Sequence, residues 1–208
     1  MRNKVSYLGF ADHFKSWGIF TTQDIIKYFP GFDSRRLFEW KQKGYIIKLA
    51  NTVYCFPDFC RTEMHLFRVA NKLYTPSYIS FETALAFHNL IPEAVMQLKS
   101  ATTRKTYSCE TELGNFEYKN IKETLFFGYA IHHVDEQPVL IAEPEKALLD
   151  LIYQNPSIKT KADFAELRLN EPSMANFDWL KMETYLAVFN QKSMNERFKI
   201  ISNQFHHA

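Results

Sequence analysis

The stretch FPGFDSRRLFEWKQKGYIIKLANTVYCF, residues 29–56, constrains the fold of this chain more than any other segment. Pro30 and Gly31 end one helix, and Gly44 is a typical C-terminal stop for the helix that follows. The runs YIIKL and TVYCF are rich in β-branched and aromatic residues, and Asn51 between them tolerates a turn conformation. The sequence therefore predicts a helix that leads directly into a β-hairpin.

Two more helices are predicted before this stretch. Aromatic residues recur at helical spacing over residues 7–17, and Gly18 follows them. Thr21 and Asp24 have the spacing of a capping box at the start of the second helix. Its buried side is expected to consist of Ile25, Ile26 and Phe29. Three helices followed by a hairpin is the order of a winged helix-turn-helix, in which the third helix enters the DNA major groove and the hairpin forms the wing.

The third helix is expected to begin after a cap at Asp33 or Ser34 and to have two distinct faces. At 100° per residue, Leu37 and Trp40 share one face and should be buried. Polar side chains on the other face suit base edges and phosphates. The residues predicted to contact DNA are Ser34, Arg35, Arg36, Phe38, Glu39, Gln42, Lys43 and Lys48. The alternative is a winged helix used only for protein contact, with solvated arginines.

Different roles are expected within that set. Arg35 and Gln42 can reach base edges, and an acidic residue at Glu39 fits best against a cytosine. Phe38 either contacts a thymine methyl group or packs on a neighbouring domain. Phosphate contacts are expected from Arg36, Lys43 and Lys48.

The distribution of charge favours two surfaces with different partners. Residues 1–60 carry nine Lys and Arg against five Asp and Glu, whereas residues 61–208 carry sixteen against eighteen. The three cysteines are an odd number without the spacing of a disulfide framework, which predicts a reduced, cytoplasmic chain. Apolar runs are too short for a membrane span, so no membrane partner is expected.

The remaining sequence predicts a second, larger domain. Helices are expected up to about Leu73, from Ser80 to about Asn89, and from Pro144 onward. Between residues 97 and 141 the apolar pattern changes to a period of two and predicts four strands. The last fifty residues predict two or three amphipathic helices. The expected fold is therefore α+β: a winged helix-turn-helix at residues 1–58, then an α+β domain at residues 59–208 with a small, mostly antiparallel sheet and C-terminal helices.

The segment that joins the two domains is not a typical flexible linker. PDFCRTEMHLFRVANKL, residues 57–73, contains no Gly and no Ser and has an apolar helical stripe. We expect it to dock on the larger domain and to restrict the orientation of the first domain. Phe59 and Phe38 are the candidates to fill the junction.

Four segments carry a family resemblance in their order along the chain. TPSYISFETALAFHNLIPEA, SATTRKT, GNFEYKNI and AEPEKALLDLIY resemble the AbiEi antitoxins of type IV toxin–antitoxin systems, over about residues 15–155. The resemblance implies that the winged helix represses its own operon by binding operator DNA. It also implies that the larger domain counteracts a toxin similar to nucleotidyltransferases. The alternative is a stand-alone transcriptional regulator that senses a ligand or a protein partner.

The sequence favours an enzymatic function less than DNA binding. Glu143, Glu145 and Lys146 are reminiscent of a metal-dependent nuclease, but Pro144 interrupts the strand that such a site needs. Acidic residues in the first turn of a helix explain the pattern more simply. The adjacent pair His132-His133 points to opposite faces of a strand and is unsuited to one metal ion. We expect no catalysis, no metal and no cofactor.

Arg104 and Lys105 are a further candidate for binding DNA or a protein partner. They lie at the end of a predicted strand, where they can extend the DNA footprint or meet an acidic toxin surface. The alternative is a solvated strand end with a salt bridge to Glu110 or Glu112.

Overall fold

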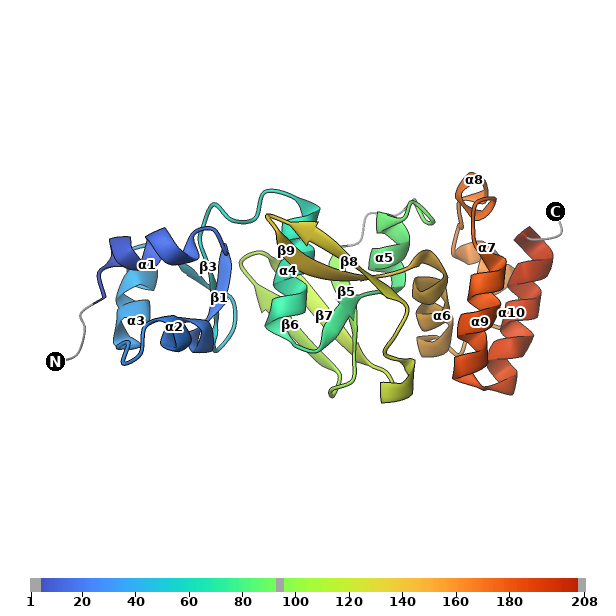
Figure 1. The fold of residues 1–208 in the computed structure, drawn as a ribbon. Coiled ribbons are helices and arrows are strands. Elements are labelled where there is room, and N and C mark those ends of the chain that lie inside the picture. Colours follow the sequence, from blue (N-terminus) through green and yellow to red (C-terminus); the bar gives the residue numbers. More distant parts are fainter. Residues whose placement is uncertain (1–4, 93–95, 206–208) are drawn as a thin grey trace.

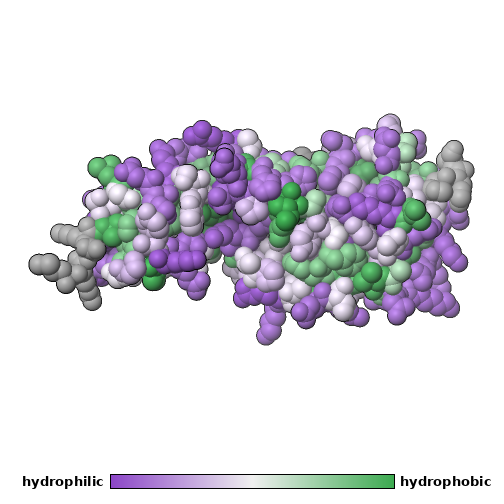
Figure 2. All heavy atoms as spheres, in the orientation of Figure 1, coloured by the Kyte–Doolittle hydropathy of each residue, from purple (hydrophilic) through white to green (hydrophobic). Residues whose placement is uncertain are grey.

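The computed structural model describes residues 5–92 and 96–205 of the chain. The described residues form a mixed α+β structure with ten α-helices, one small antiparallel sheet and one larger mixed sheet. Figure 1 shows the small sheet and first three helices at one end, the larger sheet in the centre, and the last helices at the other end. In the same orientation, Figure 2 shows hydrophilic residues over much of this face, with hydrophobic residues scattered among them. Within these residues no helix combines the length and apolarity that crossing a membrane requires.

The N-terminal part, residues 5–58, combines three short helices with an antiparallel sheet of strand order β1-β3-β2. Its elements are α1 (Tyr7–Phe14), β1 (Ile19–Thr21), α2 (Thr22–Tyr28), α3 (Arg35–Gln42), β2 (Ile47–Lys48) and β3 (Val53–Cys55). The three helices and the β2–β3 hairpin lie where the sequence predicts them. The strand β1 was not predicted, because a three-residue run is too short to show a periodic pattern.

Details of the helices confirm one expectation and correct two. Thr21 and Asp24 form the predicted capping box, since each side chain accepts the backbone N–H of the other residue. The first helix ends at Phe14, so Trp17 lies in the turn that follows. Ile26 is 49% exposed, because only one side of this short helix meets the core. The prediction that Ile26 is buried was therefore wrong.

Phe10 lies at the centre of the N-terminal core. Its ring centroid is 4.6 Å from that of Trp40 and 5.1 Å from those of Phe14 and Phe20. Phe10, Phe14 and Phe20 are completely buried. Because Trp40 belongs to α3 and Phe10 to α1, this aromatic packing fixes which face of α3 is turned outward.

The larger sheet has six strands in the order β6-β7-β5-β4-β9-β8. They are β4 (Ser77–Ile79), β5 (Gln97–Thr102), β6 (Tyr107–Thr111), β7 (Gly114–Asn120), β8 (Tyr129–Val134) and β9 (Gln137–Ala142). β4 pairs with β9 and β5 with β7 in parallel, whereas the other three pairs are antiparallel. The sequence predicted only four of these strands. It missed β4, whose three residues are all buried and do not alternate, and it merged β5 with β6.

Helices cover the sheet and continue toward the C-terminus. α4 (Glu63–Leu73) contacts β4, β5, β8 and β9, α5 (Phe81–Phe87) contacts β5, and α6 (Pro144–Gln154) lies between α5 and the C-terminal helices. The C-terminal helices are α7 (Lys161–Glu166), α8 (Glu171–Met174), α9 (Trp179–Phe189) and α10 (Lys192–Phe205), four where two or three were expected. Phe67, Val69 and Ala70 of α4 are completely buried, which confirms that the connecting segment docks on the larger domain.

A completely buried ion pair joins α6 to β4. Lys146 Nζ donates a hydrogen bond to the Asp150 carboxylate and another, of 2.7 Å, to the Tyr78 hydroxyl. Asp150 also accepts hydrogen bonds of 2.8 Å from Tyr78 and Ser80. Burial lowers the pKa of Lys146, and Asp150 opposes that shift. The segments YIS and PEKALLDL therefore meet in the core, where they hold the sheet and the helix together.

Replacement of one partner of this pair should destabilise the protein strongly. Lys146→Met leaves the Asp150 carboxylate buried without its cation and should cost about 3–5 kcal/mol of unfolding free energy. The double variant Lys146→Met/Asp150→Leu should lose less than the single variant. Urea denaturation measures both values. Lys192→Met is the matched control, since Lys192 pairs with Glu196 at the same i,i+4 spacing but is 92% exposed; a control loss as large as that of Lys146→Met would contradict the prediction.

Candidate nucleic-acid interface

The outward face of α3 consists of the residues that the sequence predicts to face away from the core. Leu37 and Trp40 are each 2% exposed, as expected. The exposed members of the predicted DNA-contacting set are Ser34, Arg35, Phe38, Glu39, Gln42, Lys43 and Lys48. They lie on α3, at its two ends and on strand β2, which follows α3 in the chain.

Arg35 is held by an acidic neighbour at the start of the helix. Its Nη2 and Nε atoms donate hydrogen bonds of 2.6 Å and 3.0 Å to Asp33, whose carboxylate also accepts the Arg35 backbone N–H at 3.1 Å. These hydrogen bonds raise the pKa of Arg35. Ser34 forms no capping hydrogen bond through its side chain, so Asp33 fills the expected capping role. Arg35 must exchange this exposed ion pair for any contact with a base or phosphate.

Arg36 is more constrained than the sequence suggests. Its guanidinium carbon lies 5.4 Å from the ring centroid of Trp40, and the residue is half-buried. The Nε atom is buried and forms no hydrogen bond. Arg36 therefore stabilises the packing of α3 through its cation–π contact, and only the outer part of its side chain can approach a phosphate.

Phe38 does not fill the junction between the two parts of the molecule. Its side chain is 67% exposed, because α3 packs on the N-terminal core through the neighbouring positions Leu37 and Trp40. The expectation that Phe38 packs at the junction was wrong. Phe59, the other candidate, is 7% exposed and occupies this position.

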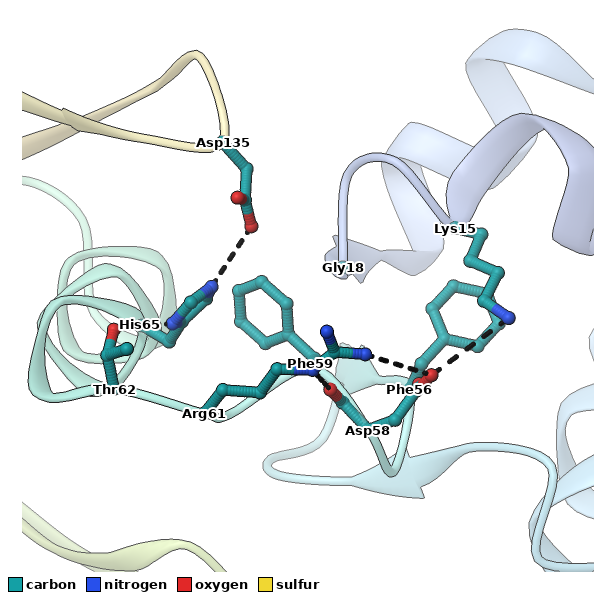
Figure 3. Close-up of a pocket in the computed structure, with 9 residues that line it drawn as sticks. All are labelled: Lys15, Gly18, Phe56, Asp58, Phe59, Arg61, Thr62, His65 and Asp135. Carbon is teal, nitrogen blue, oxygen red and sulfur yellow. Dashed lines mark hydrogen bonds and ion pairs between the residues drawn. The ribbon is translucent and has the colours of Figure 1, made fainter.

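Phe59 packs between the N-terminal part and α4 (Figure 3). Its ring centroid is 5.0 Å from that of His65, and the guanidinium carbon of Arg68 is 5.3 Å from it. On the other side the ring lies against the backbone of Gly18, where a Cβ atom would stand 1.9 Å from Phe59 Cδ2. Gly18 also has a φ of +70°, which side-chain-bearing residues rarely adopt. Only glycine fits this position without displacing the ring.

Ion pairs reinforce the junction. Lys72 at the end of α4 pairs with Asp24 of α2 at 2.9 Å. Although burial opposes it, hydrogen bonds from Lys72 and Thr21 lower the pKa of Asp24. The sequence predicts only the capping role of Asp24, because no local pattern reveals its pairing with a residue so distant in the chain. The same carboxylate thus caps α2 and attaches the N-terminal part to the larger one.

A cavity of about 350 Å³ lies beside Phe59, and Figure 3 shows the residues that line it. Asp58 Oδ2 lies 3.9 Å from Lys15 Nζ and 3.7 Å from Arg61 Nη2. Asp135, in the turn between β8 and β9, accepts a hydrogen bond of 3.0 Å from His65 Nε2 when that nitrogen is protonated. These pairs link α1 to the connecting segment, and α4 to the β8–β9 turn.

Arg104 and Lys105 lie in the exposed turn between β5 and β6. The Arg104 guanidinium carbon is 4.2 Å from the ring centroid of Tyr74, and its Nη1 atom donates a hydrogen bond of 3.3 Å to the backbone oxygen of Thr75. The Tyr74 hydroxyl donates a hydrogen bond to the Lys105 backbone oxygen at 3.0 Å. The pair is therefore separate from α3 and close to the end of α4 that carries Lys72.

The candidate nuclease residues are engaged in contacts within the larger domain, and Lys181 Nζ lies 2.8 Å from Glu143 Oε1 and 3.6 Å from Glu145 Oε2. Glu143 also accepts a hydrogen bond from the Tyr185 hydroxyl. Glu145 accepts the backbone N–H of Asp178, and Lys146 belongs to the buried ion pair described above. Across residues 5–92 and 96–205, no group of three His, Cys, Asp or Glu side chains is placed to hold a metal ion.

Comparison of the chain with protein-family models and with curated proteins finds no match. The resemblance to the AbiEi antitoxins therefore stays a prediction from the four sequence segments that carry it.

Replacement of Gly18 tests the contact with Phe59. Gly18→Ala should lower the free energy of unfolding by about 1–2 kcal/mol, because alanine disfavours the left-handed backbone conformation. Displacement of the Phe59 ring should lower it by about 1–3 kcal/mol more. Gly44→Ala is the matched control, because Gly44 has a φ of +69° but nothing lies within 4 Å of the position that a Cβ atom would take there. Thermal or urea denaturation of both variants separates the two costs. Equal losses in the two variants would show that Phe59 does not press on Gly18.

Proposed function

We propose that the N-terminal part is a winged helix-turn-helix that binds operator DNA through α3, with the β2–β3 hairpin as its wing. The observation that supports this most directly is the division of α3 into two faces. Leu37 and Trp40 anchor it to the core, while the opposite face leaves Arg35, Gln42 and Lys43 exposed. A helix with one buried face and one outward polar face is suited to lie in the major groove.

Charge and position support the same proposal. Residues 1–60 have four more basic than acidic residues, which favours approach to the phosphate backbone. Lys48 is exposed on β2, directly beside α3 in the chain, and suits a phosphate contact. Phe38 is exposed on the same helix and is therefore available for a thymine methyl group.

The larger domain is proposed to counteract a toxin similar to nucleotidyltransferases, so that the whole chain is an antitoxin that represses its own operon. This part rests on the resemblance of the four segments to the AbiEi family. The second candidate function is a stand-alone regulator that responds to a ligand. A cavity between the two parts of the molecule, lined by Trp17 and Arg68 among others, favours that alternative.

Removal of charge from α3 should weaken operator binding. If Arg35 contacts a base, Arg35→Ala/Lys43→Ala should weaken the free energy of DNA binding by about 1–3 kcal/mol. The affinity should also depend less on salt concentration, because the variant loses a phosphate contact. Gel shift with the DNA upstream of the gene, at two salt concentrations, measures both effects. Lys192→Ala/Lys199→Ala removes the same charge from exposed positions of α10 and is the control. Unchanged binding by the α3 variant would place the DNA surface elsewhere.

The antitoxin role predicts that neutralisation survives the loss of DNA binding. Full-length Arg35→Ala/Lys43→Ala should still rescue growth when it is co-expressed with the product of the adjacent gene, because the substituted side chains belong to the N-terminal part. Growth curves with and without induction give the measurement. An adjacent gene product that is not toxic, or toxicity that the wild-type chain fails to relieve, would favour the stand-alone regulator.

A further inference from the structure

A cavity of about 430 Å³ opens between the N-terminal part and the larger domain. Trp17 and Ile19 line it from the N-terminal side, and α4, the start of β4 and the start of β9 line it from the other. Its volume is in the lower part of the range for small-molecule sites. The cavity is distinct from the one in Figure 3, because the two have no lining residue in common.

Three residues of the wall carry buried polar atoms that form no hydrogen bond. These atoms are Arg68 Nη1, Asn71 Nδ2 and Ser77 Oγ. Arg68 is 7% exposed and Ser77 is 2% exposed. Asn71 Oδ1 accepts the backbone N–H of Leu140 at 2.7 Å, which leaves its amide nitrogen as the group without a partner. Buried polar groups are normally paired, so these three groups around one cavity are candidate donors to an acceptor placed in it.

The charged side chains that line this cavity are all positive. Arg68 and Lys72 line the cavity, and no carboxylate is among the described residues around it. Lys72 is paired with Asp24, so Arg68 is the cation that lacks a hydrogen-bonded anion. Burial lowers the pKa of Arg68 to about 10, against the opposing effect of Asp135, and the guanidinium is still charged at neutral pH. An anion placed beside it would gain a charge-assisted hydrogen bond.

The rest of the wall is largely apolar. Its aromatic side chains are Trp17, Phe126 and Tyr129, and the remaining lining residues are Ile19, Thr75, Pro76, Gln137, Pro138 and Leu140. Flat apolar surfaces of this kind favour a flat apolar ligand body. Trp17 is partly buried and stands at the turn before β1, so a ligand in the cavity would contact both parts of the molecule at once.

We propose that this cavity binds a small aromatic carboxylate, whose anionic end pairs with Arg68 and whose ring packs against Trp17, Phe126 and Tyr129. Asn71 and Ser77 donate the remaining hydrogen bonds to the carboxylate. The site goes beyond DNA recognition, since none of its residues belongs to α3. Because its walls come from both parts, occupancy stabilises one orientation of the N-terminal part relative to the larger domain.

Titration of the full-length protein with indole-3-acetate and with benzoate tests the site, with calorimetry as the readout. The neutral amides indole-3-acetamide and benzamide have the same shapes and serve as ligand controls. At least one carboxylate should bind saturably at one site per chain, about tenfold or more tighter than its amide, which corresponds to the loss of one charge-assisted hydrogen bond. The absence of saturable binding by both carboxylates, or equal affinity for carboxylate and amide, overturns the proposal.

Variants locate the site within the chain. Arg68→Met should lower carboxylate affinity about tenfold, to the level of the amide, whereas Arg61→Met, at the cavity in Figure 3, should leave it unchanged. Ser77→Ala is the second variant in case Arg68→Met does not fold. It removes a hydroxyl without a partner, so it should keep or raise the melting temperature while weakening carboxylate binding severalfold. Wild-type affinity in every folded variant at Arg68 or Ser77 overturns the assignment.

Discussion

The contact of the Phe59 ring with the backbone of Gly18 determines how the two parts of this protein are joined. The ring approaches so closely that a side chain at Gly18 would displace it, and its other side packs on His65 and Arg68 of α4. The connecting segment is therefore packed from both directions. The Asp24–Lys72 pair acts at a second point, between α2 and the far end of α4. Two separated attachments limit rotation far more than one attachment does.

Helix α3 has a fixed orientation, but the ion pair of Arg35 on its surface is easily broken. The aromatic packing of Phe10 and Trp40 sets the orientation of the helix. Arg35 is paired with Asp33 in the free protein, but both groups are near solvent, and exposed ion pairs contribute little to stability. Release of Arg35 toward a phosphate or base therefore costs little.

Local patterns in the sequence predict the N-terminal part well and the junction only in part, since Phe59 lies there as expected and Phe38 does not. Leu37 and Trp40 were placed correctly because helical periodicity depends only on near neighbours, and the capping box at Thr21 depends on a spacing of three residues. Strands β1 and β4 were not predicted, because a strand of three residues is too short to show an alternating apolar pattern. For Phe38 the periodicity gave the right face, yet its assignment to the junction failed. That assignment required knowledge of which surfaces meet, and such contacts join residues far apart in the chain.

The parallel pairing of β4 with β9 has a consequence for the order of folding. Ile79 aligns with Ile141, so the larger sheet is incomplete until both strands have been synthesised. In the N-terminal part, by contrast, β1 needs only β3 and the most distant aligned residues are Ile19 and Cys55. Local contacts form faster than distant ones, and domains tend to fold as they leave the ribosome. The N-terminal part should therefore be native while the sheet is still a nascent chain, and the cavity between them should form only after β9 has joined the sheet.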